Sequence, residues 1–312
     1  MRLGRAVAAA LVLLLAAPVE AQQLDFKRVS RSGDELLSYR WRDHGKHVHT
    51  LSFTLTRQAI REAESSFAEF SLEAMWRVVE RDLREEVERF GNGGRINIRR
   101  LPDGLSWTIE ARDQAAIDRL TRKVEERLVK SKQDYLTRHL RRMVGEKRIL
   151  VDFAAATTAL QNPLRAVARA LGDLPDVPNE DRARVALALG FFQEIPYAVL
   201  DDKRRQGGDF LPGPALLAQN RGDCDSKAVA LAAVLRTFTR FRKLAVVTMP
   251  GHAILAVEMP AQPGDTTIKQ GGRLYVALEP AGPALAPIGQ VGSYSAKYLA
   301  GLARDIELWP LE

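Results

Sequence analysis

Three residues of this chain have the types and the sequence settings of a thiol-based catalytic site. Cys224, the only cysteine, follows an Arg-Gly-Asp turn. Three residues separate it from the apolar run AVALAAVLRTF, which begins at residue 228. His252 follows a Pro-Gly turn at the start of HAILAVEM, and Glu279 stands near the end of RLYVALEP. Nucleophilic catalysis combines such groups as attacking thiol, general base and orienting carboxylate. The sequence therefore predicts a Cys–His–Glu site.

The setting of Cys224 predicts a reactive thiol. The thiolate is the nucleophilic form, and the N-terminus of a helix lowers the pKa of a thiol through its unpaired N–H groups and its dipole. Asp223 and Asp225 oppose this effect, although either is suited to cap the helix, and Arg221 and Lys227 offset it. The alternative is an inert buried cysteine, which is the usual state of a lone cysteine on an apolar helix.

The elements around these residues predict how they meet. Residues 224–238 are expected to form a buried helix, and KLAVVTM, HAILAVEM and RLYVALEP are expected to form strands. If the second and third strands are antiparallel neighbours, the start of one lies beside the end of the other, and His252 adjoins Glu279. The spacer PAQPGDTTIKQGG between them is then expected to be a surface hairpin loop.

The chain divides by pattern into a leader and two units. Residues 1–21 combine a positive start, a short apolar core and small residues near the end, which is typical of a secretory signal peptide cut after Ala21. Residues 22–148 are expected to form a small α+β domain of hairpin, helix, hairpin and helix, with the helices on one face of an antiparallel sheet. Residues 149–312 are expected to form the α+β domain that carries the site.

Periodicity gives the expected elements of both units. In the first unit, one helix is predicted over 57–90 and another has apolar residues in phase over 117–143, each after a hairpin. In the second unit, helices are predicted over 163–172 and 180–192. The stretch 200–222, rich in Gly, Pro and charge, is expected to be a loop.

Composition and charge narrow the partners. The formal net charge is +7, but arginine and glutamate are interleaved along the predicted helices, which is typical of solvated helix faces and not of a nucleic-acid surface. No segment after the leader has the length and apolarity of a membrane span. His44, His47 and His49 lack a further ligand at fixed spacing, so a polar hairpin is expected there, with no metal and no other cofactor.

Three blocks, RGDCDSKAVALAAVLRTF, PGHAILAVEM and LYVALEPAG, resemble the transglutaminase-like superfamily of papain-like thiol enzymes, and more narrowly its exported bacterial cysteine peptidase-type members. The resemblance covers about residues 150–295. It implies a papain-like, transglutaminase-like catalytic core, in which the helix carrying the cysteine packs on an antiparallel sheet. It also implies Cys224 as nucleophile, His252 as base and Glu279 as orienting acid.

The segment FFQEIPY is similar to a Phe-x-Gln-x-x-Pro-Tyr segment of the same group. Gln193 thereby matches a position close to the catalytic centre, where its amide is of the type that donates to an oxyanion; the alternative is that it only ties a helix to a loop. Tyr197 either lines the cleft or merely packs. The chain departs from the pattern in PAGPALAP after Glu279, where many relatives have threonines, and in the long spacer between the strands.

The residues and the resemblance together predict an exported thiol hydrolase, most simply a cysteine peptidase that acts through a thioester on peptides or proteins of the cell envelope. Its location is expected to be periplasmic or secreted. Two alternatives stay open. An amine instead of water would make the enzyme a protein-glutamine acyltransferase, and a non-catalytic binding module could retain the same fold.

Overall fold

The computed structural model describes residues 23–102, 104–145, 148–200, 210–282, 285–301 and 305–312. Within these ranges the chain has a mixed α+β fold with antiparallel sheets, as predicted. None of the helices described is both long enough and apolar enough to cross a membrane. The predicted signal peptide, residues 1–21 with the cut after Ala21, lies outside the described residues.

The elements are short strands and mostly short helices, with two longer helices in the first half of the chain. In chain order they are β1 (Gln23–Arg31), β2 (Asp34–Arg42), β3 (Val48–Thr56), α1 (Arg57–Glu69), α2 (Leu72–Phe90), β4 (Arg95–Leu101), β5 (Gly104–Glu110), α3 (Gln114–Arg138), β6 (Arg141–Val144), β7 (Arg148–Val151), α4 (Phe153–Gln161), α5 (Arg165–Gly172), α6 (Asp181–Glu194), α7 (Gly213–Gln219), α8 (Cys224–Phe238), β8 (Leu244–Met249), β9 (His252–Val257), β10 (Thr267–Gln270), β11 (Arg273–Leu278), α9 (Ser293–Leu299) and β12 (Glu307–Pro310).

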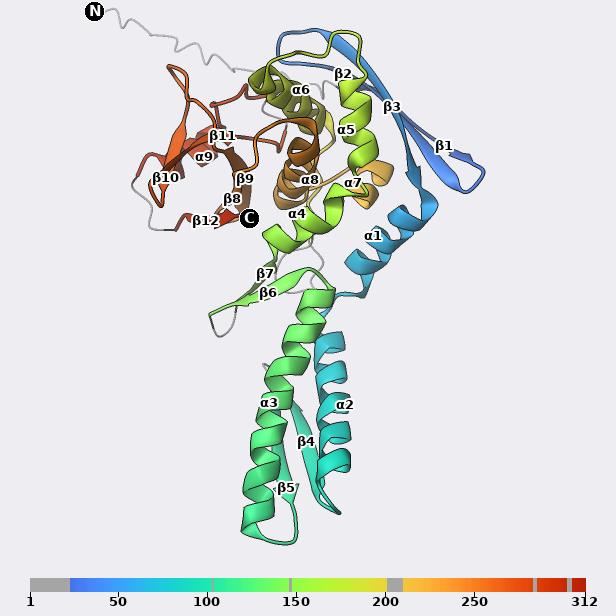
Figure 1. Ribbon diagram of the computed structural model, residues 1–312, viewed down its shortest axis with the longest axis vertical. Coiled ribbons are helices and arrows are strands. Elements are labelled where there is room, and N and C mark those ends of the chain that lie inside the picture. The colour runs from blue at the N-terminus through green and yellow to red at the C-terminus, as the bar shows by residue number, and fades with distance from the viewer. Residues whose placement is uncertain (1–22, 103, 146–147, 201–209, 283–284, 302–304) are drawn as a thin grey trace, which may run out of the picture.

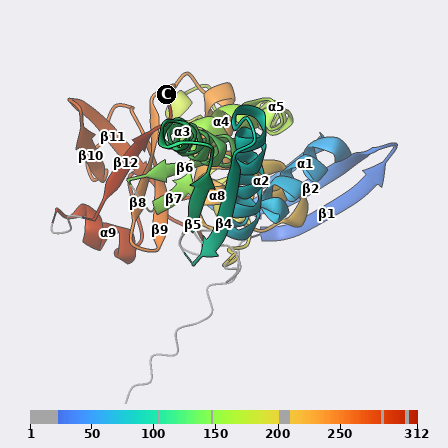
Figure 2. The same cartoon turned by 90° about the horizontal axis from the view of Figure 1, so that it is seen from below.

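The main body places helices α4 to α8 between two antiparallel sheets (Figures 1 and 2). One sheet has the order β1-β2-β3, and the other has the order β10-β11-β9-β8-β12. A single core of buried apolar side chains joins both sheets to the helices, with members such as Tyr39 in β2, Phe191 in α6, Leu231 in α8 and Leu255 in β9. The body therefore folds mainly around this core, and a smaller cluster that includes Ile254 and Tyr275 packs separately from it.

Helix α8 is the centre of this interior. Its residues 228–235 are all fully buried, and it packs against α4, α5, α6 and β9. The run combines four alanines with valine and leucine, and these small side chains let neighbouring elements approach its backbone from several sides. Such all-round burial fixes the position of its first residue, Cys224.

Residues 72–138 form a lobe that projects from the body (Figure 1). Helices α2 and α3 pack on each other and on the hairpin β4–β5. They enclose a second core, which includes Val79, Leu83, Ile96 and Val124. The hairpin β6–β7 lies where the lobe meets the body.

The domain boundary predicted at residue 148 does not separate the two cores. The first predicted hairpin, β2–β3, buries Leu37, Tyr39 and Phe53 in the core of the body, and α1 joins it there. The apolar face of these strands is covered by helices that follow residue 149, and β1 pairs with β2 as a third strand that was not predicted. The separate unit is therefore the lobe alone.

The single helix predicted over 57–90 is two helices. The chain leaves the helical conformation at Phe70, and Ser71 begins α2 by accepting a hydrogen bond from the Ala74 N–H at 3.0 Å. A serine at this position competes for backbone donors and so favours a new helix start. The break also turns the Phe70 ring into the core of the lobe.

The long helix predicted to reach residue 143 ends at Arg138. Leu140 has a left-handed backbone with φ of 55°, which a right-handed helix cannot accommodate, and Met143 lies in β6 opposite Ile149. Met143 still packs on the core of the lobe, so it is apolar at a position that also fits the periodicity of the preceding helix.

Two segments expected to be loops contain further elements. Helix α7 lies within 200–222, where its apolar residues are buried below β2 and the Tyr39 hydroxyl donates to the Leu217 carbonyl at 2.6 Å. Strand β10 lies within the spacer before β11, with Gly271 and Gly272 as the turn at positive φ. The other hairpin β4–β5, helices α5 and α6, and strands β8, β9 and β11 confirm the sequence predictions.

The two cores predict two separable responses to cavity-creating substitutions. Leu83→Ala in the lobe and Leu231→Ala in α8 each remove a fully buried side chain and are expected to cost about 2–5 kcal/mol of stability. Hydrogen exchange read by mass spectrometry should increase over residues 72–138 for Leu83→Ala, with α8 still protected. Leu231→Ala should increase exchange throughout the body. Equal loss of protection in α8 from both changes would contradict the division into two cores.

Candidate active site

The start of α8 is held by hydrogen bonds on both sides of Cys224. Asp223 is the N-cap, and its Oδ1 accepts from the Ser226 N–H at 3.2 Å. Asp225 Oδ1 accepts from the same N–H at 2.9 Å. The Ser226 hydroxyl in turn accepts from the Leu211 N–H at 2.8 Å, so the helix start is also tied to the segment before α7.

His252 and Glu279 are brought together by the pairing of β9 with β11. The register places Leu278 opposite Leu255, so the start of β9 lies beside the end of β11. His252 Nε2 lies 2.8 Å from Glu279 Oε1, and the other carboxylate oxygen accepts from the Ser295 hydroxyl at 2.6 Å. The predicted proximity of His252 and Glu279 is confirmed. Ser295, from α9, was not predicted.

The sulfur of Cys224 lies against the same end of β9. It accepts hydrogen bonds from the backbone N–H groups of Ala253, the residue after His252, and of Asp225. The Tyr197 hydroxyl is a further hydrogen-bond partner of the sulfur. The structure therefore gathers the thiol, the histidine strand and Tyr197 at one place, with Tyr197 in contact with the predicted nucleophile.

The pKa of the Cys224 thiol is raised to about 12, which corrects the prediction that the helix start would lower it. Burial is the main cause, and the charges of Asp225 and Asp223 add to it. The N–H groups of Ala253 and Asp225 act in the opposite direction without overcoming these effects. Near neutral pH the thiol is therefore protonated, and a base has to remove its proton when the sulfur attacks.

The two aspartates beside Cys224 form a buried pair. Burial raises the pKa of Asp223 to about 9, helped by the charge of Asp225 and a hydrogen bond between the two side chains. Burial also raises the pKa of Asp225, whereas Asp223 and the Arg141 guanidinium from β6 act to lower it. At neutral pH the pair therefore holds at least one proton, which reduces the negative charge next to the sulfur.

Gln193 lies at the end of α6 and is buried. Its Nε2 donates to the carbonyl oxygens of Glu279 and Ala286, at 2.8 Å each. Both amide N–H groups are thus engaged, and they tie α6 to the segment after β11. This is the alternative that the sequence left open for Gln193, and it leaves the residue no free N–H for an oxyanion.

A buried lysine attaches the segment of Tyr197 to the start of α8. Lys227 is fully buried, and its Nζ donates to the Ile195 carbonyl. Next to this contact, the Ala198 N–H donates to the Gly222 carbonyl at 3.1 Å, and the Gly222 N–H donates to the Pro196 carbonyl at 3.2 Å. Lys227 and Gly222 therefore hold residues 195–198 beside Cys224.

Glu194 is the buried acid that acts on this lysine. Only 4% of Glu194 is exposed, and neither of its carboxylate oxygens has a hydrogen-bond partner among the residues described. Burial raises its pKa to about 7, opposed by the charges of Lys227 and Arg42. Burial likewise lowers the pKa of Lys227 to about 8, opposed first by Glu194. A charged residue in an apolar helix is usually expected on the surface, so the burial of Glu194 and Lys227 was not predicted.

A cavity of about 470 Å³ adjoins the histidine and the carboxylate, with Gly251, Ala281, Gly292 and Tyr294 among its lining. The Tyr294 hydroxyl donates to the Pro250 carbonyl at 2.5 Å, and its ring meets the His252 ring edge-on at 6.0 Å between centroids. The space beside His252 is thus walled by glycines and an anchored tyrosine.

Across the part of the chain that the structure describes, no group of three or more His, Cys, Asp or Glu side chains is placed to hold a metal ion. No protein-family model, no curated protein and no solved structure matches the chain.

Asp223→Asn is expected to stabilise the protein above about pH 4, because asparagine keeps the cap and removes a carboxyl whose folded pKa is raised. In the wild type, the unfolded chain ionises at Asp223 from about pH 4, while the folded chain holds the proton up to about pH 9. That contribution to stability is complete below about pH 4 and is lost as the pH rises to about 9. Urea unfolding at pH 5, 7 and 9 should show a growing advantage for Asp223→Asn.

The matched control is Asp113→Asn at the N-cap of α3. The Ala116 N–H holds the pKa of Asp113 below its usual range, so its contribution to stability is present above the unfolded pKa and lost as the pH falls. Asp113→Asn should therefore destabilise the protein at pH 7. The same sign of effect for both variants would refute the assignment for Asp223.

Lys227→Met should destabilise the protein by about 1–3 kcal/mol, because it leaves the Ile195 carbonyl without its donor and removes the positive charge that acts on the buried Glu194. The double variant Lys227→Met/Glu194→Gln should recover part of this loss, since it removes the unpaired charge as well. Chemical denaturation measures both. No recovery in the double variant would show that Lys227 and Glu194 do not act on each other.

Proposed function

We propose that the chain is a thiol hydrolase of the transglutaminase-like cysteine peptidase type, with Cys224 as nucleophile, His252 as general base and Glu279 as orienting acid. The observation that carries the proposal is the 2.8 Å contact between His252 and Glu279, next to an Ala253 N–H that donates to the Cys224 sulfur. These contacts support a site in which the thiol at the start of α8 adjoins the strand of the base, and the base adjoins the acid.

The carboxylate fixes the state of the histidine. Glu279 is 3% exposed and accepts from Ser295, so its free acceptor faces His252 Nε2 and favours the tautomer with the proton on that nitrogen. Nδ1 is then the basic nitrogen. Because the resting thiol is protonated, the site works by general-base catalysis: Nδ1 takes the sulfur proton as the sulfur attacks, and Glu279 stabilises the imidazolium that results.

The reaction follows as two acyl transfers. The sulfur forms a bond to the amide carbonyl carbon, and the carbonyl oxygen becomes an oxyanion near the backbone N–H of Cys224 at the start of α8. His252 gives its proton to the amide nitrogen, the C–N bond breaks and the amine leaves. A water molecule then loses a proton to His252 and attacks the thioester, which releases the carboxylic acid and restores the thiol.

The surroundings of the site support the same reading. Helix α8 packs against β9 of a five-stranded antiparallel sheet, which is the arrangement expected of a papain-like, transglutaminase-like core. We further propose export by the signal peptide of residues 1–21, which places the substrate, a peptide or protein, in the cell envelope. Tyr197 contributes to the cleft through its contact with the sulfur.

Cys224→Ala is expected to abolish hydrolysis of any cleaved peptide, and His252→Ala is expected to reduce it by a factor of about 100 or more. Glu279→Gln should cause a smaller loss, because glutamine keeps an acceptor but not the charge. Turnover of a peptide library, read by mass spectrometry, measures all three. Asp25→Asn, a change at an exposed carboxylate of β1, is the matched control and should leave turnover unchanged.

A labelled primary amine in the same assay distinguishes the acyl acceptors. Incorporation of the amine without hydrolysis would replace the proposal by transamidation.

Alkylation of Cys224 by iodoacetamide gives a readout that needs no substrate. The alkylation rate should rise about tenfold per pH unit from pH 7 to 9, because only the thiolate reacts. Full hydrolysis by Cys224→Ala would exclude a thiol mechanism altogether.

A further inference from the structure

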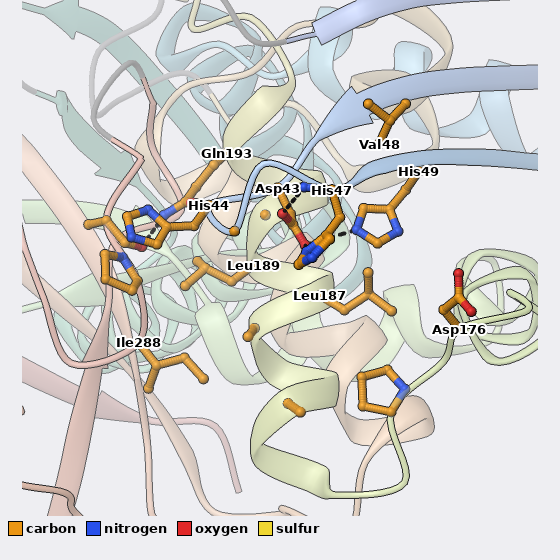
Figure 3. Close-up of a pocket in the computed structure, with 17 residues that line it drawn as sticks. Asp43, His44, His47, Val48, His49, Asp176, Leu187, Leu189, Gln193 and Ile288 are labelled. Carbon is orange, nitrogen blue, oxygen red and sulfur yellow. Dashed lines mark hydrogen bonds and ion pairs between the residues drawn. The ribbon is translucent and has the colours of Figure 1, made fainter.

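A second cavity, of about 600 Å³, has Gln193 in its lining, the residue that donates to the Glu279 carbonyl. It is bounded by the loop between β2 and β3, by α6 and by residues 286–288 (Figure 3). None of the three proposed catalytic residues lines it. Its volume is within the range of small-molecule sites.

Histidines and a carboxylate form one polar wall of this cavity. Asp43 accepts from the His47 N–H at 2.8 Å, and its other oxygen lies 2.9 Å from His49 Nε2 and 3.3 Å from His47 Nδ1 (Figure 3). Each ring directs one nitrogen at Asp43. The second ring nitrogen, His47 Nε2 or His49 Nδ1, accepts a hydrogen bond when the ring is neutral. Burial acts to raise the pKa of Asp43, but the bonds from His49 and His47 outweigh it and hold the pKa below its usual range.

The remaining polar lining offers mainly acceptors. Both N–H groups of Gln193 are engaged with backbone carbonyls, which leaves its Oε1 as an acceptor. Asp176 adds a second carboxylate, His44 retains one donor and one acceptor, and none of the described residues of the lining is a lysine or an arginine. The described lining therefore carries two carboxylates without a side chain of fixed positive charge.

The rest of the cavity is apolar. Ala183, Ala186, Leu187 and Ile288 supply carbon surface (Figure 3 shows Leu187 and Ile288 projecting from α6 and from the segment after β11). Gly190 lies among them without a side chain. A Cβ added there would lie 3.7 Å from Asp43 Cβ, which is an ordinary van der Waals distance.

We propose that this cavity binds a ligand that combines a primary ammonium group with a short hydrocarbon chain. The ammonium donates hydrogen bonds to the acceptors of Asp43, His47 and His49 and complements their negative charge, and the hydrocarbon lies on the apolar wall. A carboxylate ligand meets two negative charges, and an alcohol of the same length supplies a single donor and no charge. The proposal does not depend on the catalytic role of Cys224.

The test compares three probes of equal length, n-hexylammonium, 1-hexanol and hexanoate, by isothermal titration calorimetry on the full chain. Saturable binding of the ammonium, at least about tenfold tighter than binding of the alcohol, with no binding of the carboxylate, supports the proposal. Equal binding of ammonium and alcohol, or no saturable binding of the ammonium, overturns it.

Three variants locate the binding. Asp176→Asn changes an exposed residue at the cavity, and Asp43→Asn removes the central carboxylate; each should weaken binding of hexylammonium, Asp43→Asn by at least about tenfold. Gly190→Ala narrows the cavity next to Asp43 without a clash and should also weaken binding, which keeps the proposal testable if Asp43→Asn does not fold. Asp25→Asn, outside the cavity, should bind as the wild type does. Unchanged affinity in Gly190→Ala and Asp176→Asn would place the ligand elsewhere and refute the proposal.

Discussion

The complete burial of α8 is the constraint on which the rest of the structure depends. Its residues 228–235 have no exposed surface, so α4, α5, α6 and β9 must all be in place before Cys224 has a defined position. The first turn of the helix brings polar groups into the same interior, and each needs a partner there. Asp223, Ser226 and Lys227 find theirs in backbone groups of the helix start and of neighbouring segments.

Burial also sets the electrostatics of the site. It raises the pKa values of Cys224, Asp223 and Glu194, and it lowers that of Lys227, because a charged form of each loses its hydration. The proposed base therefore meets a neutral thiol and not a resting ion pair. The Glu279 carboxylate, held by His252 and Ser295, is the charge around which the proposed catalysis is arranged.

Periodicity and turn residues in the sequence predicted the individual helices, strands and hairpins. The apolar run after Cys224, the strands around the Pro-Gly turn and the two hairpins are visible as periodicity and turn chemistry. The placement of β1–β3 was not predictable in this way, since an apolar strand face does not specify which helices will cover it. Two contacts were not predicted: Ser295 donates to Glu279, and Lys227 donates to the Ile195 carbonyl. The sequence does not reveal that this serine and this lysine are buried.

The protonated state of Cys224 has a consequence for the lifetime of the protein. Oxidants attack the thiolate far faster than the thiol, and the sulfenic acid they form leads to irreversible products. A thiol with a pKa of about 12 presents very little thiolate at neutral pH, and Cys224 is only partly exposed. The burial that raises the pKa of Cys224 therefore also slows the oxidation of its sulfur.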